Sequence, residues 1–473
     1  MEEIITSLVQ ELGKTLLEAD LSFIEEADRF DKFERTVMAA CTHTAAEFLS
    51  AALTDLDECI RKNADANRYT KQRRRYRTLI STAGTLKYRH TVFKDKRNGT
   101  YRSLLNEMVR LPDRERFTTE AETLVLKRAA EESYQKSADE LRIGDQEITK
   151  STVKDIVHGI PAVIPEAEET GEKKEAEYLY LEADEDHIAV QKDPEQQGCF
   201  IGKLIYLYES KEDVCEGKKQ LVGKQYFGGL HRGSEANIRL WEGVQTYIES
   251  HYDTEVLKKV YIASDGGGWI TGGARYIYKG QLVADKFHVK KYINSVANLT
   301  LDERDIVKGR FYEYINKNKL LAAKKYLTRI QRHCGGDEIV ERARTYLISN
   351  WTAIVRAFRD KNVYGCSAEG HVSSVYSDRM SSRPMGWSET GSDRMCKLRC
   401  YTRNGGNVID LVRYRRELVL AGSCEATGTE DAIALPKYTA AQQRDRRYIE
   451  QIQVTIPGYT ARKTLSIREQ IHE

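Results

Sequence analysis

The spacing of apolar side chains predicts helices along the first part of the chain. Near the N-terminus, apolar residues recur at helical intervals at Ile4, Ile5, Leu8, Leu12 and Leu16. The same spacing returns over residues 48–60, and helical character resumes over residues 118–158. We therefore expect a helical N-terminal region over residues 1–65 and further helices shortly before residue 160.

A basic segment separates these helical stretches and leads into a predicted β-hairpin. Residues 78–82 and 85–90 are short alternating stretches, as strands are, and they flank Ala83 and Gly84. A small residue followed by glycine favours a tight turn between two strands. Residues 66–160 are thus expected to hold a basic hairpin followed by helices.

Two short helical patterns near the end of this region suit a helix-turn-helix. Residues 133–141 and 151–158 lie on either side of Gly144, and Ser151 is the expected N-cap of the second helix. In a helix-turn-helix the second helix enters the major groove of DNA, where it would present Lys154. An ordinary pair of packed helices has the same pattern, so both interpretations stand.

A linker and a change of pattern follow. Residues 161–177 are rich in Pro, Glu, Gly and Lys, which is typical of a linker between domains. Strands are then expected at residues 178–184, 187–191, 204–208, 221–227, 260–264 and 282–284. Helical patterns occupy residues 234–252 and residues 301–358. This order predicts an α+β domain of the kind that a ribonuclease H-like fold produces.

Composition fits a folded protein with more than one domain. The chain has 473 residues, 31% charged and 40% hydrophobic, which is long enough for two to four domains. No run approaches the roughly 18 apolar residues of a membrane span, and the N-terminus lacks the pattern of a secretory signal. We expect a cytoplasmic protein with no membrane partner, in agreement with nine scattered cysteines.

Charge by itself decides little. The formal net charge of +2 argues mildly against non-specific coating of nucleic acid. Basic clusters at residues 71–75 and 444–447 can nevertheless bind phosphates, because acidic segments at 165–177 and 182–186 cancel them in the sum. A solvated surface is the ordinary role of any one of these runs.

Two aspartates close strands that are expected to be buried. Asp184 ends the first strand after the linker, and Asp265 follows a largely apolar strand and precedes three glycines. A turn or a cap is the usual role of one such aspartate. Phosphodiester cleavage, however, is served by two divalent ions, and carboxylates on rigid strands are suited to hold them. Two aspartates in this setting favour a metal site.

A third carboxylate has to be chosen among 72 acidic residues. Glu369 is the best local candidate, because Ser367 can cap a short helix that places Glu369 in its first turn. Val372, Ser373 and Tyr376 are expected on the same helical face.

Several longer motifs run through the chain. They are the basic and hairpin segment at residues 75–89, the helix-turn-helix at Tyr134, and the runs at residues 182–187, 264–266, 285–288, 367–373 and 378–388. The last two runs are long and unusual in composition, so they are highly specific. In these motifs the chain resembles, over nearly its whole length, the ISLre-type insertion-sequence transposases, which are related to the Mutator-like DDE transposases.

The resemblance implies a catalytic triad of Asp184, Asp265 and Glu369. These carboxylates would hold Mg²⁺, with Mn²⁺ able to substitute. Asp186 lies two residues beyond Asp184 on the same strand face, and it remains an alternative for the first carboxylate.

The resemblance also marks residues around the triad. Asp285 and His288 match the Asp-x-x-His signature that Mutator-like transposases carry after the second aspartate, which favours a role beside the site. Arg379, Arg383 and Trp387 belong to the last motif. The arginines are expected to contact the DNA backbone, and the tryptophan is expected to stack on an unpaired base.

The expected organisation places DNA binding before catalysis. A ribonuclease H-like core would comprise residues 178–300 and 361–410, with a helical insertion at residues 301–360 and a C-terminal extension at residues 411–473. The predicted function is that of a DNA transposase, which binds terminal inverted repeats and target DNA as a homodimer or larger homo-oligomer. Two alternatives stay open: a stand-alone nuclease with the same core, and a domesticated, non-catalytic DNA-binding regulator.

Overall fold

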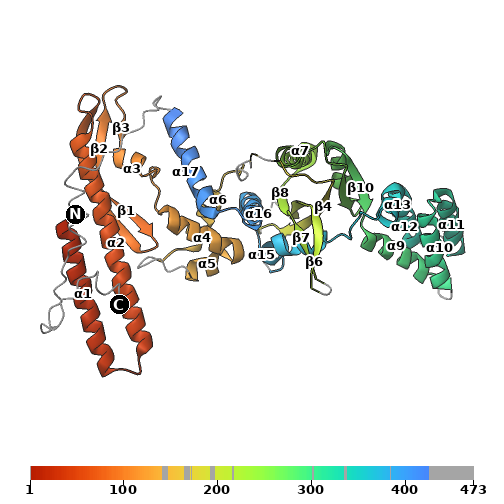
Figure 1. Ribbon diagram of the computed structural model, residues 1–473, viewed down its shortest axis with the longest axis horizontal. Helices are drawn as coiled ribbons and strands as arrows, with labels where there is room; N and C mark the ends of the chain where they lie inside the picture. Colours follow the sequence, from red (N-terminus) through yellow and green to blue (C-terminus); the bar gives the residue numbers. More distant parts are fainter. Residues whose placement is uncertain are drawn as a thin grey trace. The chain divides into compact units, whose positions relative to one another are not determined.

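The computed structural model of the protein divides into two compact units (Figure 1). It describes residues 2–140, 147–164, 171, 173–191, 198–215, 218–300, 303–334, 338–383 and 385–425. Unit 1 contains Met1–Gly159 and Val408–Glu473, and unit 2 contains Ile160–Asn407. The sequence predicts a boundary near residue 160, whereas the return of the chain to unit 1 is a finding of the structure.

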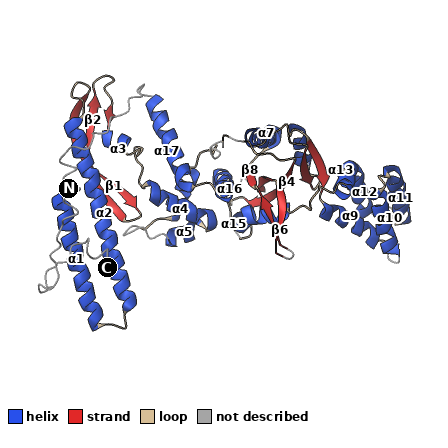
Figure 2. Cartoon of the chain, viewed as in Figure 1, coloured by secondary structure: helices blue, strands red, loops and turns tan. Residues whose placement is uncertain are grey.

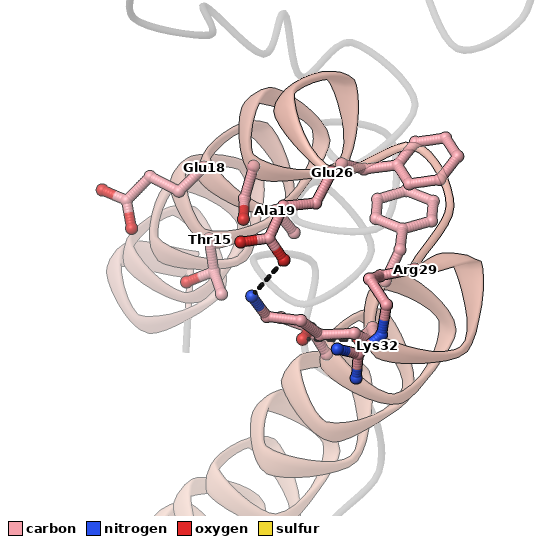
Figure 3. A pocket seen from close by; sticks show the side chains of 10 residues that line it. Thr15, Glu18, Ala19, Glu26, Arg29 and Lys32 are labelled. Atoms are coloured by element: carbon pink, nitrogen blue, oxygen red, sulfur yellow. Dashed lines mark hydrogen bonds and ion pairs between the residues drawn. The ribbon is translucent and has the colours of Figure 1, made fainter.

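Unit 1 begins with two long helices, α1 (Glu2–Glu25) and α2 (Phe30–Asn63), as predicted for residues 1–65. They pack side by side, and the rings of Phe23 and Phe33 stack with centroids 4.8 Å apart. A cleft of about 290 Å³ lies between them, bordered by the ion pair of Lys32 with Glu26 (Figure 3). The cleft is lined wholly by unit 1 residues, whereas the candidate catalytic carboxylates belong to unit 2.

The predicted hairpin is confirmed. Strands β1 (Tyr69–Ser81) and β2 (Gly84–Asp95) pair antiparallel, and β3 (Tyr101–Arg102) extends the sheet. Helix α2 covers β2 and satisfies backbone donors that would otherwise lack partners. The backbone N–H groups of Lys87, Arg89 and Thr91 donate to the side chains of Ser50, Thr54 and Asp57, respectively.

Short helices complete unit 1. They are α3 (Leu104–Met108), α4 (Thr119–Glu131), α5 (Tyr134–Glu140), α6 (Lys150–His158) and α17 (Val408–Glu425). The N-cap of α6 is Thr149, not Ser151 as expected, because the chain turns helical at Lys150 and the Thr149 hydroxyl accepts the Thr152 N–H at 3.3 Å. Gly144, the expected turn residue, lies outside the described residues.

Helix α17 joins unit 1 by packing on α4. Arg415 and Arg416 reach the carboxylate of Glu122, which is 1% exposed, at 2.8 and 3.0 Å. A buried carboxylate requires paired cations, so these two arginines fix the helix in place.

The core of unit 2 is a mixed sheet of five strands, in the order β10-β9-β4-β5-β8. The strands are β4 (Tyr178–Ala189), β5 (Cys199–Tyr208), β8 (Gln225–Gly229), β9 (Lys259–Ser264) and β10 (Gly280–Ala284). β4, β5 and β8 are antiparallel neighbours, whereas β9 and β10 run parallel to β4. A separate two-stranded hairpin, β6 (Ser210–Cys215) and β7 (Lys218–Val222), lies between β5 and β8 in the chain.

Two predicted strand boundaries are wrong. Residues 187–191 are not a separate strand, because β4 continues through Ala189 opposite Cys199 of β5. The predicted strand at residues 221–227 is divided between β7 and β8, with Gly223, at a φ of 60°, in the turn between them.

Helix α7 (Gly233–His251), predicted at residues 234–252, covers one face of the sheet. Its apolar stripe packs on aliphatic side chains of the strands, among them Leu181, Ile205 and Ile262. The short α8 (Gly268–Gly273) and the 3-10 turn η1 (Ala274–Tyr276) follow β9. Because a Cβ at Gly273 would overlap the indole of Trp241 at 1.9 Å, only glycine fits where α8 meets α7.

The helices predicted over residues 301–358 are present, and the helical group between β10 and α14, named here the helical insertion, begins earlier than predicted. Its helices are α9 (Lys286–Asn298), α10 (Arg304–Asn316), α11 (Leu320–His333), α12 (Glu338–Ser349) and α13 (Trp351–Arg359). They share their own apolar core, which Phe311 and Leu347 help to fill. Figure 2 shows this helical group beside the strands of unit 2.

The remaining helices of unit 2 cover the other face of the sheet. α14 (Ala368–Val372), the π-helical turn η3 (Ser373–Ser377) and α15 (Asp378–Met380) are continuous, and α16 (Glu389–Arg403) follows. Among the described residues, no helix combines the length and apolar character needed to cross a bilayer.

Candidate active site

Three aspartates lie at corresponding positions on neighbouring parallel strands. Glu182 of β4 pairs with Ala263 of β9, so continuing the register by two residues places Asp184 beside Asp265. On the other side of β9, Ala284 pairs with Ser264, and the Asp285 N–H donates to the Ser264 carbonyl at 3.0 Å. The register therefore aligns Asp184, Asp265 and Asp285 across the sheet.

The same register decides which face these aspartates occupy. Side chains alternate between faces along a strand, so Asp184 shares a face with Tyr180, and Asp265 shares a face with Tyr261. The rings of Tyr180 and Tyr261 stack with centroids 5.6 Å apart. Both aspartates thus belong to this tyrosine-lined face, opposite the face that α7 covers.

Asp184 does not end its strand, which corrects the sequence-based expectation. β4 stays paired with β5 through Ala189, whereas its parallel neighbour β9 ends at Ser264. Asp184 is therefore the first residue of β4 beyond the end of β9, and it is half-buried. Asp265 does follow the end of a strand, as expected.

Glu369 reaches the same face from a helix. It is exposed in the first turn of α14, which packs against β4. The expected common face of Glu369, Val372, Ser373 and Tyr376 does not form: Val372 and Tyr376 are buried whereas Glu369 and Ser373 are exposed. Residues four apart keep the same exposure, so Glu369 and Ser373 lie on the exposed side of the helix and Val372 and Tyr376 on the buried side.

The pKa shifts show that the carboxylates affect one another. Burial raises the pKa of Asp184, and the charges of Asp265, Glu185 and Glu369 add to this, although the Glu185 N–H opposes it. Burial also raises the pKa of Asp285, to which the charges of Glu182 and Asp265 contribute. As the side chains stand, no three His, Cys, Asp or Glu residues in the described part of the chain are arranged to hold a metal ion.

Asp186, the alternative first carboxylate, lies deeper than Asp184. It is 9% exposed, and its Oδ1 accepts a hydrogen bond from the Ser381 hydroxyl at 3.0 Å. Its Oδ2 is buried and has no hydrogen-bond partner among the described residues. The contact with Ser381 ties this carboxylate to the segment after α15 and distinguishes it from Asp184.

The loop after Asp265 requires glycine. Gly266 has a φ of +102°, and a Cβ there would lie 3.1 Å from the ring of Tyr346 in α12. The Gly267 N–H donates to Asp265 Oδ1 at 2.8 Å. The glycines thus let the helical insertion approach the carboxylate and hold its side chain.

Asp285 caps a helix in addition to being aligned with Asp184 and Asp265. Its Oδ1 accepts the Phe287 N–H at 2.9 Å and so caps α9. His288 lies one turn along, with its Nε2 3.9 Å from Asp285 Oδ2. The pair therefore joins the sheet edge to the insertion.

Sequence reasoning missed a buried carboxylate on the tyrosine-lined face. Glu182 is 1% exposed and accepts hydrogen bonds from Tyr206, from Tyr208 at 2.6 Å, and from the Ser367 N–H at 2.5 Å. Lys211 Nζ lies 3.0 Å from its Oε1. Burial raises the pKa of Glu182, but Lys211 and the donated hydrogen bonds outweigh it and lower the pKa overall. The alternation of tyrosines along β4 and β5 is the only sequence signal of this cluster.

Of the four residues expected to contact DNA, the structure buries two and exposes two. Trp387 is 4% exposed, donates its indole N–H to the Met380 carbonyl, and lies under the guanidinium of Arg379, which is 3% exposed. These two side chains are packed together and buried in this structure, so the expectation that they contact DNA stays a prediction. Arg383 and Lys154 are exposed, and Lys154 Nζ lies 3.3 Å from the carboxylate of Asp155.

Similar proteins place the chain in a family. Residues 23–416 match UPF0236, an uncharacterised protein family. Two UPF0236 proteins of Caldanaerobacter subterraneus subsp. tengcongensis are similar to the chain. One is 31% identical over 385 residues, covering 80% of this chain and 79% of that protein. The other is 30% identical over 388 residues, covering 80% of each.

More distant similarities carry less weight. A UPF0236 protein of Streptococcus gallolyticus, named for its place in a vanSb 3′ region, is 23% identical over 66% of this chain and 68% of its own length. The solved Drosophila P element transposase strand transfer complex is 12% identical over 67% of this chain and 83% of that chain, with a TM-score of 0.22. So low a score carries no argument. The family match and the two relatives at 30–31% identity establish that the chain belongs to UPF0236, an uncharacterised protein family.

Proposed function

We propose that the protein is a DNA transposase of an insertion sequence, which cuts and joins phosphodiester bonds with Asp184, Asp265 and Glu369. One observation carries the proposal: two aspartates aligned by strand register and a glutamate on a helix reach the same face, where β9 ends. Carboxylates on rigid elements around an open edge are suited to phosphoryl transfer.

The sheet supports a ribonuclease H-like core. Apart from the β6–β7 hairpin and the short α8 and η1, three antiparallel strands, a helix and then two strands parallel to the first follow one another in the chain, and the parallel pair lies beside the first strand. The helical insertion falls between the second aspartate and Glu369. The resemblance to ISLre-type transposases implies this arrangement.

The carboxylates at the site are of the residue type that divalent cations bind. Carboxylate oxygens are the ligands that Mg²⁺ and Mn²⁺ prefer, and the mutual influence of these carboxylates shows a surplus of negative charge at the site. Asp184, Asp265 and Glu369 would hold the ions, which supply charge neutralisation and an activated nucleophile. The chain itself orients Asp265 through the Gly267 N–H and orients α14 through Glu182.

Unit 1 would recognise the ends of the element. The exposed face of β1 and β2 carries Tyr76 with Arg89 and Lys87 over its ring, at 4.8 and 5.3 Å from its centroid. Helices α5 and α6 have the size of a helix-turn-helix, with Lys154 exposed on the second. Basic and aromatic side chains of this kind suit DNA, and a homodimer or larger assembly would bring two ends together.

The names of the relatives also support a mobile element. The name of one Caldanaerobacter relative joins eleven designations from that organism, and another joins four. A sequence that copies itself to new positions in one genome would be expected to produce names of this kind.

A cleavage and joining assay tests the proposal. Purified protein is incubated with Mg²⁺ and labelled DNA from the regions that flank its coding sequence, where terminal repeats would lie. We expect cut ends and strand-transfer products, and Asp265→Asn should reduce both by at least about a hundredfold, since even outer contacts to a metal ligand are worth 10–100-fold.

Glu235→Gln is the matched control, because Glu235 lies on α7 over the opposite face and its side chain is 87% exposed. It should leave both reactions unchanged. Cleavage without joining would identify a nuclease, and a DNA complex without cutting would identify a regulator. Full activity in Asp265→Asn would contradict the assignment of that carboxylate.

A further inference from the structure

The loop that carries Asp265 also forms one wall of a cavity. The cavity has a volume of about 650 Å³, within the range of ligand sites. Gly266, the end of α8 and strand β10 line one side, and the junction of α12 and α13 lines the other. The insertion and the sheet thus border a solvent-open pocket next to the residue that follows a candidate catalytic carboxylate.

The lining of this cavity is polar and cationic. It includes Arg275 and Arg356, the amides of Gln281 and Asn350, and several hydroxyl groups, but no Asp or Glu. The absence of acidic side chains is notable in a chain with 72 of them. A site that lacks carboxylates and presents two guanidinium groups is suited to an anion.

Neither arginine makes an ion pair within the part of the chain that the structure describes. Arg356 donates to the backbone carbonyl of Leu282 on β10, an edge strand, and Arg275 Nε donates to the Gly272 carbonyl at 2.8 Å. These bonds hold each guanidinium at the cavity while leaving N–H groups for another acceptor. By contrast, Arg239 on α7 faces Glu235 at 3.8 Å.

We propose that this cavity binds a phosphodiester of the DNA strand next to the phosphate that is cut. The inference rests on the proposed function, because DNA at Asp265 would bring the adjoining backbone to Gly266. Guanidinium groups match the planar, two-pronged geometry of phosphate oxygens, and the glycine backbone allows close approach. The helical insertion would then hold the substrate strand rather than only extend the fold.

The test measures DNA binding and cleavage in the Arg275→Ala/Arg356→Gln variant. Binding to the flanking duplex is measured without Mg²⁺ over a series of NaCl concentrations. Loss of one phosphate contact should reduce the slope of log K against log salt by about 1. Cleavage with Mg²⁺ should fall by roughly tenfold to a hundredfold, because the scissile phosphate would be misplaced.

Two further variants keep the result interpretable. Arg275→Ala alone removes only a bond within its own turn, so it should change the slope without lowering the unfolding midpoint. Arg239→Ala removes an exposed arginine outside the cavity and should change neither slope nor rate. An unchanged slope and rate in the double variant, with cleavage by the natural protein, would overturn the phosphate site alone. If the natural protein does not cut, the proposed function fails, and the slope still decides whether the cavity binds phosphate.

Discussion

The two faces of the central sheet of unit 2 are built from the same strands but contact the helices that cover them through different interactions. Beneath α7, Leu179, Leu181 and Val260 form an aliphatic layer with essentially no exposed surface. The opposite face carries stacked tyrosines and the buried carboxylate Glu182. Apolar contact is non-directional, so it fixes α7 by shape and area. The tyrosine-lined face is held by hydrogen bonds, which also fix orientation.

This difference explains where a catalytic group can be placed. The Ser367 N–H, just before α14, donates to Glu182, and Lys211 donates to Glu182, to Gly365 and to the Ser367 hydroxyl. These bonds set the start of the helix that carries Glu369. A shift of α7 would loosen close-packed apolar contacts, whereas a shift of α14 would break a buried charged network.

Among the substitutions that test this comparison, Glu182→Gln is expected to have the largest effect on stability and cleavage. The change leaves the Lys211 ammonium without its buried counter-charge, so the free energy of unfolding should fall by about 3–5 kcal/mol. Cleavage per folded molecule should fall as well, because α14 loses its fixed position. Urea unfolding and single-turnover kinetics measure the two effects separately.

A double variant tests the cause. Lys211→Met added to Glu182→Gln removes the unpaired charge and should recover part of the lost stability, while cleavage stays low because α14 remains misplaced. Normal cleavage per folded molecule in Glu182→Gln would show that the network stabilises the fold without positioning Glu369.

Leu181→Ala probes the opposite face at the neighbouring residue. Loss of a fully buried leucine should lower the free energy of unfolding by about 2–5 kcal/mol. Cleavage per folded molecule should stay unchanged, since the side chain points away from the carboxylates. A lower rate with full occupancy of the folded state would mean that the two faces are not independent.

Tyr208→Phe should have the smallest effect. It removes one of the hydrogen bonds to Glu182, at 2.6 Å, but leaves the Lys211 pair intact. The free energy of unfolding should fall by about 1.5–3 kcal/mol, the range for a hydrogen bond to a charged group. Thermal unfolding of this variant beside Tyr278→Phe, whose tyrosine is 52% exposed, checks that the loss is specific to the network.

Local patterns in the sequence were sufficient for many elements. The helical spacing of Leu240, Val244 and Ile248 predicts α7, and all three residues are buried. Alternation on both sides of Ala83 predicts the β1–β2 hairpin. These signals are informative because buried side chains recur at a regular spacing within a single helix or strand.

Other features depended on residues far apart in the chain. Asp184, Asp265 and Asp285 align only through the register of β4, β9 and β10, and no local pattern encodes a register between separate strands. Likewise, the burial of Arg379 against Trp387 and the network around Glu182 arise from packing between segments. The sequence by itself determined the helices, the hairpin and the candidate catalytic carboxylates. Only the tertiary structure decided which of them meet, because contact energies depend on positions that the whole fold sets.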